Sequence, residues 1–221
     1  MKENKWIKAL LWLLLICFYI FINIMFGSII KSLNIKNHLL LNTVYIISEI
    51  IITGILVYLY RNDFKGKFKE LNSKEGNKKI TSSIKIWLLG LLGMVIFNIF
   101  LSTIIKDIAE NESLNRDTLK DLSFYAYTTM IILTPICEEI IFRLSPSKMF
   151  NNKYIYIIFS GLMFGFAHVF LSSGIQMLYI LPYTSLGIAF SSIYANKQNI
   201  LCSILMHSLH NLICILIIVL I

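Results

Sequence analysis

The residues of this sequence that could do chemistry are ionisable side chains placed inside long apolar stretches. They are Glu49, Glu138, Glu139, Arg143, His168, His207 and His210, and the amide of Asn211 accompanies them. Ionisable groups in such surroundings are costly and usually have a function. Because carboxylates and imidazoles exchange protons with reacting groups, this set points to general acid–base chemistry.

Two adjacent glutamates and an arginine occupy the apolar segment Thr134–Arg143. On a helix Glu138 and Glu139 point about 100° apart, so we expect that they do not serve the same partner. Glu139 and Arg143 are four residues apart on one face and are expected to form an ion pair. Glu138 then lacks a local cation, and a lone carboxylate in an apolar cavity suits the role of general base. Pro135 removes one helix hydrogen bond and is expected to kink the segment.

Two further segments place polar groups on one helix face. Phe164 and His168 are four residues apart, and Gly165 beside them lets another helix approach closely. His207 and Asn211 have the same spacing of four. Counted from the inner end of each helix at about 1.5 Å per residue, the polar groups of all three segments lie about 15–22 Å deep. They are therefore expected to meet in one site.

Helices that cross a membrane must position these groups. The chain is 57% hydrophobic and 14% charged, whereas soluble domains are about one-quarter charged. A spanning helix needs about 20 mostly apolar residues, and an open strand in lipid would leave its backbone groups unsatisfied. The sequence therefore predicts an all-α, multi-pass bundle of about seven spans. The expected spans are Ala9–Ile30, Leu39–Tyr60, Ile86–Ile105, one within Asp121–Lys153, two within Tyr154–Asn196 broken near Ser172–Gly174, and Gln198–Ile221.

The lysines and arginines predict the orientation. With the N-terminus inside, fifteen of the 20 lysines and arginines lie on the inner side. This bias places the N-terminus in the cytoplasm and the C-terminus outside a cell membrane. Residues 1–120 hold the first three spans and a basic inner segment, and residues 121–221 hold all three polar segments. With no visible repeat or linker, we expect one structural domain.

The basic inner segment, residues 61–85, has two interpretations. Phe64, Phe68 and Leu71 recur at helical spacing among lysines, which is typical of an interfacial helix on anionic lipid. The alternative is a solvated loop that only sets the topology. The net charge of +8 gives no reason to expect a nucleic-acid partner, because the inner side of a membrane accounts for most of the basic residues.

The order of the polar groups resembles the CAAX protease and bacteriocin-processing family, also called the CPBP or Abi family of intramembrane glutamic endopeptidases. That family carries Glu-Glu-x-x-x-Arg, then Phe-x-x-x-His, then His-x-x-x-Asn on successive membrane helices. Here the three motifs run from Glu138 to Arg143, from Phe164 to His168 and from His207 to Asn211. Each motif alone is weak, whereas all three in this order are specific.

The resemblance implies an intramembrane endopeptidase without a metal cofactor. In that reaction Glu138 and His168 would activate a water molecule, and His207 and Asn211 would bind the developing oxyanion. The chemistry is coherent, because a buried carboxylate suits a general base and oxyanion donors gain strength at low dielectric.

The remaining motif residues are expected to support the site. The resemblance gives this role to Glu139 and Arg143, with Phe164 as the first position of the second motif. Members often have glycine after the arginine, where this chain has Leu144. The expected substrate is a peptide or a membrane-associated protein, in peptide maturation or bacteriocin self-immunity, and nothing in the residues indicates a prenyl group.

Other classes of protein fit the same residues. A zinc metallopeptidase could use Glu138, Glu139, His168 and His207 as ligands, although adjacent glutamates pointing 100° apart make poor joint ligands. A non-catalytic membrane scaffold or binding protein could hold the same polar cluster as a structural network. A transporter is a third class, which the absence of a repeat in so short a chain disfavours.

Several groups outside the motifs are expected to be structural. Glu49 is expected to lie near Arg143 or to bond a neighbouring helix, and His210 is expected to pack or hydrogen-bond. Tyr183 and Trp87 are interpreted as packing or interface aromatics. The four cysteines all fall in apolar stretches and are expected to be reduced and buried.

Overall fold

Among the residues that the structure describes, six helices are long and apolar enough to cross a membrane, and a shorter apolar helix covers Lys153–Val169. The computed structural model describes residues 5–121 and 123–220, without the side chains of residues 121–123. Over these residues it is helical, with no strand. The predicted all-α, multi-pass fold with about seven spans is confirmed. Ile221 and Lys2, used above for the last span and the charge count, lie outside the described residues.

Helices and short helical turns follow one another along the described residues. They are α1 (Lys5–Ser32), α2 (His38–Leu59), α3 (Arg61–Phe64), α4 (Lys67–Leu71), α5 (Lys74–Ser102), α6 (Glu110–Asp121), α7 (Ser123–Thr128), the π-helical turn η1 (Thr129–Leu133), α8 (Thr134–Glu139), the π-helical turn η2 (Ile140–Leu144), α9 (Ser145–Ser147), α10 (Lys153–Val169), the 3₁₀ turn η3 (Gly174–Tyr179), α11 (Ile180–Lys197) and α12 (Ile200–Leu220).

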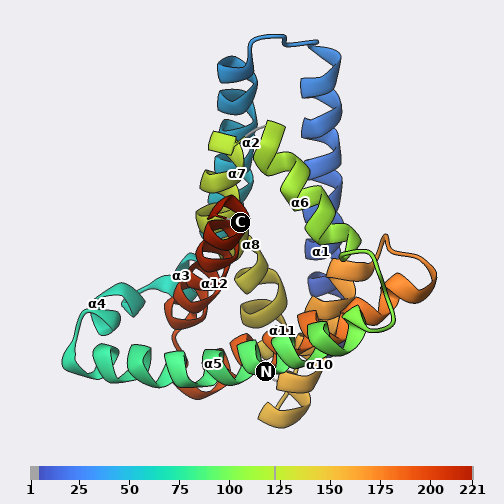
Figure 1. Cartoon of the computed structure of the whole chain (residues 1–221). Helices are drawn as coiled ribbons and strands as arrows, with labels where there is room; N and C mark the ends of the chain where they lie inside the picture. The colour runs from blue at the N-terminus through green and yellow to red at the C-terminus, as the bar shows by residue number, and fades with distance from the viewer. Residues whose placement is uncertain (1–4, 122, 221) are drawn as a thin grey trace.

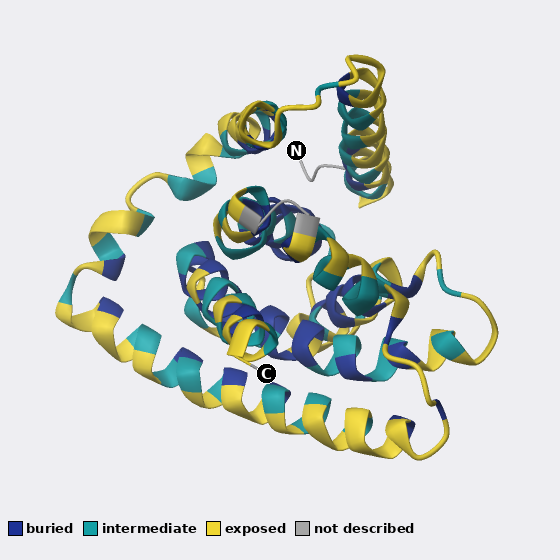
Figure 2. Cartoon of the chain, turned by 45° about the horizontal axis from the view of Figure 1, so that its top comes forward, coloured by how far each residue is buried: buried dark blue, intermediate teal, exposed yellow. Residues whose placement is uncertain are grey.

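Two neighbouring pairs, α10 with α11 and α11 with α5, make the most extensive contacts in the fold. In Figure 1, α1 and α2 stand upright side by side, α5 runs across the bottom, and the short helices α7 and α8 with α12 lie between them. The outer face of α5 is largely exposed and its inner face is buried, as Figure 2 shows. Its exposed residues include Leu88, Leu92 and Ile96, as expected of a helix face in contact with lipid.

Small residues bring α10 and α11 into close contact. A Cβ atom on Gly161 would lie 2.6 Å from Cγ1 of Ile188, and one on Gly187 would lie 2.6 Å from the carbonyl oxygen of Gly161. A Cβ atom on Gly165 would lie 2.9 Å from the backbone nitrogen of Thr184. The close approach predicted for Gly165 is confirmed, and these glycines set the distance between the two helices.

Replacing Gly161 by alanine is therefore expected to destabilise the protein by about 1–3 kcal/mol, because the added methyl group overpacks a closed contact. Gly54 is a matched control in the middle of α2, with nothing within 4 Å of the position of its Cβ. Gly54→Ala should be neutral or stabilise by up to about 1 kcal/mol. The melting temperatures of Gly161→Ala and Gly54→Ala are measured in the same detergent. Equal melting temperatures would contradict this account of the packing.

The basic segment forms helices rather than an open loop. It contains α3, α4 and the first three turns of α5, which begins at Lys74 instead of near Ile86. The side chain of Leu71 is buried in the same core cluster as Trp87, whereas that of Phe68 is 70% exposed. The backbone of this segment is therefore helical, as the first of the two interpretations expected.

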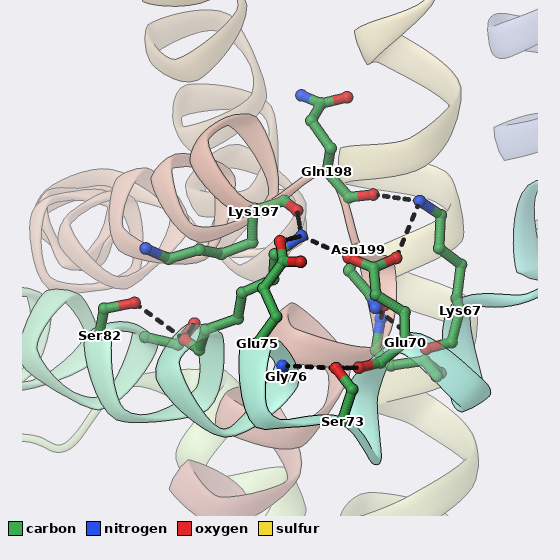
Figure 3. Close-up of polar contacts among 12 residues, drawn as sticks. Lys67, Glu70, Ser73, Glu75, Gly76, Ser82, Lys197, Gln198 and Asn199 are labelled. Atoms are coloured by element: carbon green, nitrogen blue, oxygen red, sulfur yellow. Dashed lines mark hydrogen bonds and ion pairs between the residues drawn. The ribbon is translucent and has the colours of Figure 1, made fainter.

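A polar cluster joins this segment to the link between α11 and α12, and Figure 3 shows it. Lys67 donates from Nζ to the carbonyl oxygen of Gln198 at 2.7 Å, and Lys79 donates to that of Lys197 at 3.1 Å. Both lysines also pair with Glu70. The buried side chain of Asn199 donates to the carbonyl oxygen of Lys67 at 3.1 Å. Two lysines thus satisfy the terminal carbonyls of α11 and fix the start of α12, the helix that carries the third motif.

Stability should depend on Glu70 at acid pH. The hydrogen bond from Lys79, with the charges of Lys67 and Lys79, lowers the pKa of Glu70 below its usual value. A carboxylate with a lowered folded-state pKa stabilises the fold above its unfolded pKa, and this contribution is lost as pH falls through the folded-state pKa. Between about pH 6 and 3, Glu70→Gln should therefore flatten the fall in melting temperature. Glu75→Gln is the control, because the Glu75 side chain is 73% exposed, and an unchanged acid profile in Glu70→Gln would contradict the assignment.

Candidate active site

The first motif lies on a helix that is interrupted twice by π-helical turns. The segment runs from α7 through η1, α8 and η2 to α9, and the two glutamates end α8. The carbonyl groups near its end accept bonds from other helices: Ser160 donates to the carbonyl oxygen of Phe142, and Tyr156 donates to that of Arg143 at 3.2 Å. Leu144 is 1% exposed and packs in the surrounding core. The helix that carries the carboxylates is thus held by side chains of α10.

Glu139 is the fully buried centre of a polar network. Its Oε2 lies 3.4 Å from Nε of Arg143, so the predicted ion pair is present, with both side chains 0% exposed. Ser203 of α12 donates to the same oxygen, and Nδ1 of His207 lies 2.9 Å from the other oxygen, Oε1. A buried carboxylate is tolerated where charge and hydrogen bonds compensate it.

The imidazole of His207 contacts both glutamates. Its Nδ1 faces Glu139, and its Nε2 lies 3.6 Å from Oε2 of Glu138. The expectation that the two carboxylates could not serve the same partner is therefore wrong. The two glutamate side chains point about 100° apart, but one imidazole can contact both because its two nitrogen atoms lie on opposite edges of the ring. Glu138 also differs from Glu139 in exposure, since its side chain remains 17% exposed.

Phe164 lies at the centre of the aromatic packing around the site. The guanidinium of Arg143 lies 4.3 Å from its ring centroid and 5.6 Å from that of Phe190. The ring of Phe164 also contacts His168, with centroids 4.3 Å apart, and His207, with centroids 5.6 Å apart. One phenylalanine thus provides a cation–π contact for the buried arginine and packs against both motif histidines.

His168 has a defined hydrogen-bonding direction. Its Nδ1 lies 2.8 Å from the carbonyl oxygen of Phe164. Because a carbonyl oxygen only accepts, Nδ1 donates this hydrogen bond, and Nε2 is left as the ring nitrogen available to a substrate or water molecule. His168 and His207 pack on the same ring of Phe164. His207 in turn contacts Glu138, so side chains of all three motifs gather around Phe164 and His207.

Tyr183 holds the other face of the His168 ring. The two rings stack with centroids 4.5 Å apart and an interplanar angle of 28°. The hydroxyl of Tyr183 accepts a 3.4 Å hydrogen bond from Asn111 of α6. Interpreted from sequence as a packing or interface aromatic, Tyr183 packs specifically against a site histidine.

Asn211 and His210, the two remaining candidate residues of α12, face different neighbours. Asn211 donates from Nδ2 to the carbonyl oxygen of Met130 at 2.8 Å, one turn beyond His207 on the same face. His210 is buried among Trp87 and Phe190, and its Nε2 lies 3.5 Å from Sγ of Cys214. The packing role expected for His210 agrees with these contacts.

Glu49 and Cys137 do not pair with the motif residues. Glu49 faces Tyr125 of the neighbouring helix α7. The thiol of Cys137 lies 3.2 Å from Oγ1 of Thr53. The cysteines are free, but Cys17 is exposed and Cys214 half-buried, so the expectation that all four are buried is wrong for these two. Where side chains are described, no three of His, Cys, Asp and Glu gather into a metal-ligand set.

Two site residues were missed in the sequence. Ser203 bonds Glu139, and Phe190 stacks on His207 with centroids 4.7 Å apart. Ser203 precedes His207 by four residues on the same helix face, which is a spacing that could have revealed it. Phe190 carries no such signal, because an aromatic residue in a long uncharged stretch resembles any other core residue.

The fold and the site define a multi-pass helical membrane protein with a buried carboxylate–imidazole–guanidinium centre. Residues 120–213 match the profile of a family described as type II CAAX prenyl endopeptidase Rce1-like, and this range contains all three motifs. The family resemblance that those motifs indicate is confirmed.

Curated relatives cover different parts of the chain. A protein of Mycoplasma capricolum described as an uncharacterized protein is 33% identical over 78% of this chain and 54% of its own length. From Lactococcus lactis, UPF0177 protein YbdI is 26% identical over 58% of this chain and 72% of its own, and UPF0177 protein YajF is 36% identical over 32% of each. The chain thus spans about half the length of the Mycoplasma relative. No solved structure matches it.

Proposed function

We propose that the protein is an intramembrane endopeptidase that cleaves peptides or membrane-associated proteins with a water molecule activated by Glu138 and His168. The observation that carries this proposal is the convergence of three helices on one centre. His207 contacts Glu138, and the rings of His168 and His207 pack on the same Phe164. The match of residues 120–213 to a family of CAAX-type endopeptidases supports it. Peptide maturation and bacteriocin self-immunity are the processes in which we place it.

The proposed reaction starts with the water molecule. Glu138 takes a proton from the water while Nε2 of His168 accepts its second hydrogen as a hydrogen bond, and the resulting hydroxide attacks the carbonyl carbon of the scissile peptide. The carbonyl oxygen becomes an oxyanion, which the amide of Asn211 and Nε2–H of His207 stabilise. When the C–N bond breaks, the proton held by Glu138 passes to the leaving amine, which yields a free amine and a new carboxyl group.

The remaining site groups hold this arrangement. Glu139 binds Nδ1 of His207 and so orients the ring, and Arg143 balances the charge of Glu139. Phe164 supports both Arg143 and His168 through its ring. The proposed mechanism uses no metal ion, so a chelator should leave the rate unchanged.

We propose that the protein lies in the cell membrane with its N-terminus in the cytoplasm and its C-terminus outside. Anionic lipid is the partner proposed for the basic segment. Lys74, Lys78 and Lys85 are exposed and lie within about 40° of one another around α5. The exposed ring of Phe68 would enter the headgroup region beside them.

The test uses purified protein in liposomes and a library of membrane-inserted peptides, with mass spectrometry of the products. Wild-type protein should cleave a subset of the peptides with and without a chelator. His168→Asn keeps a donor near Nδ1 but has no Nε2 lone pair, and should lose most of the cleavage. Equal cleavage by wild-type protein and His168→Asn would contradict the proposal, and loss with the chelator would favour a metallopeptidase.

A further inference from the structure

Two prolines of the first-motif helix each follow a π-helical turn at the same distance. The turn Thr129–Leu133 is followed by Thr134 and Pro135, and the turn Ile140–Leu144 is followed by Ser145 and Pro146. In both cases the N–H group of the intervening residue bonds the carbonyl oxygen five residues earlier: Thr134 bonds that of Thr129, and Ser145 bonds that of Ile140.

This register determines which carbonyl group loses its backbone partner. In a π-helical register the next pair after Thr134 and Thr129 would be residue 135 with Met130. Proline has no N–H group, so Pro135 cannot bond the carbonyl oxygen of Met130. A buried carbonyl group without a partner is costly, and another donor is expected to take its place.

Asn211 provides that donor from another helix. Its Nδ2 donates to the carbonyl oxygen of Met130 at 2.8 Å. A side-chain amide carries two N–H groups on one nitrogen, and their directions are fixed once the plane of the amide is fixed. The bond to Met130 therefore uses one N–H group and sets the direction of the other, one turn from His207.

The second π-helical turn repeats the arrangement away from the motif histidines. Its register would pair residue 146 with Ile141, and Pro146 again has no N–H group. The carbonyl oxygen of Ile141 instead accepts a 2.9 Å hydrogen bond from Nε1 of Trp12 in α1. The same sequence feature thus produces the same consequence twice, once for a proposed oxyanion donor and once for a packing residue.

We propose that Pro135 is a positioning residue, which keeps the carbonyl group of Met130 open so that it orients the amide of Asn211 toward the oxyanion. The proposal rests on the proposed peptidase function. Alanine at position 135 would restore an N–H group that can bond the carbonyl oxygen of Met130 and compete with Asn211. The amide would then be less well oriented, although the chain would fold at least as well, because alanine suits a helix interior better than proline.

The kinetic test combines Pro135→Ala with Asn211→Ala. Asn211→Ala should lower kcat by about 10²–10³-fold with little change in KM, because an oxyanion donor acts in the transition state. Pro135→Ala should lower kcat about tenfold by the same route. In the double variant the proline substitution should add almost nothing, whereas a merely structural role of Pro135 would add its full effect.

Pro146→Ala is the matched control, because it restores the equivalent N–H group beside Trp12. Its kcat should stay close to that of wild-type protein. A readout without catalysis is the side-chain amide resonance of Asn211 in ¹⁵N-asparagine-labelled protein, assigned by its absence in Asn211→Ala. It should shift in Pro135→Ala and stay in place in Pro146→Ala.

The outcomes separate the two claims. An unmoved Asn211 resonance in Pro135→Ala, or additive losses of kcat, would overturn the positioning role. A resonance that shifts in a protein that cleaves no peptide would leave the orienting contact intact and overturn the peptidase function and the catalytic purpose of that contact.

Discussion

Replacing Glu138 by glutamine should lower kcat/KM for peptide cleavage by about 10²–10⁴-fold, while the protein still folds and inserts. Glutamine has nearly the same shape and can keep a contact with His207, but it cannot take a proton from water. Glu138 is partly exposed and lies 3.6 Å from Nε2 of His207, so removing its charge does not dismantle the network around Glu139. Initial rates and thermal unfolding of the purified variant measure the two expectations.

Glu49→Gln is the control for this experiment. It removes a carboxylate from another spanning helix, where the neighbouring polar side chain is Tyr125 rather than a motif residue. Cleavage should persist, with a modest loss of stability of about 0.5–1.5 kcal/mol from the altered polar contact. The account would be contradicted by a Glu138→Gln protein that cleaves like wild type, or by equal losses of activity in the two variants.

Replacing Arg143 by leucine is expected to destabilise the protein by about 3–5 kcal/mol, because it leaves a buried carboxylate without its counter-charge. Both side chains of the pair are 0% exposed, and the guanidinium also packs on Phe164. Denaturant unfolding in detergent measures the loss, and the amount of inserted protein should fall with it. Combining Arg143→Leu with Glu139→Gln should recover part of the stability, since the uncompensated charge is then absent.

Lys148→Met tests whether the loss of stability in Arg143→Leu is caused by burial of the ion pair. Lys148 pairs with Asp63 at 2.7 Å, but its side chain is 42% exposed. Such a pair contributes about 0–1 kcal/mol, so this variant should unfold close to wild-type protein. Similar losses in Arg143→Leu and Lys148→Met would contradict the role given to the buried pair.

The spans and the ion pair could be predicted from the sequence because they depend on local patterns. Gaps between charges located the spans, including the break near Gly174, which has a positive φ of 55°. The ion pair expected from the spacing of four between Glu139 and Arg143 forms although Arg143 lies within a π-helical turn. Both features follow from hydrophobicity or from one helix face, and neither needs knowledge of which helices are neighbours.

The contacts that the sequence could not reveal depend on neighbouring helices. His207 reaches both glutamates only because α12 lies beside α8, and this arrangement overturned the expectation that they have separate partners. The stacking of Tyr183 on His168 depends in the same way on the close approach of α10 and α11. The register change at Pro135 was missed because proline in a helix was expected to kink it rather than to leave one carbonyl group for a second helix.

The most direct test of the central claim is a proteome-wide comparison of peptide termini in membranes that contain equal amounts of inserted wild-type protein or Glu138→Gln. The account predicts termini that are present with the wild-type protein and absent with the variant, and their sequences would identify the substrates. Identical sets of termini would contradict it, and the polar centre around His207 would then be a structural or binding device.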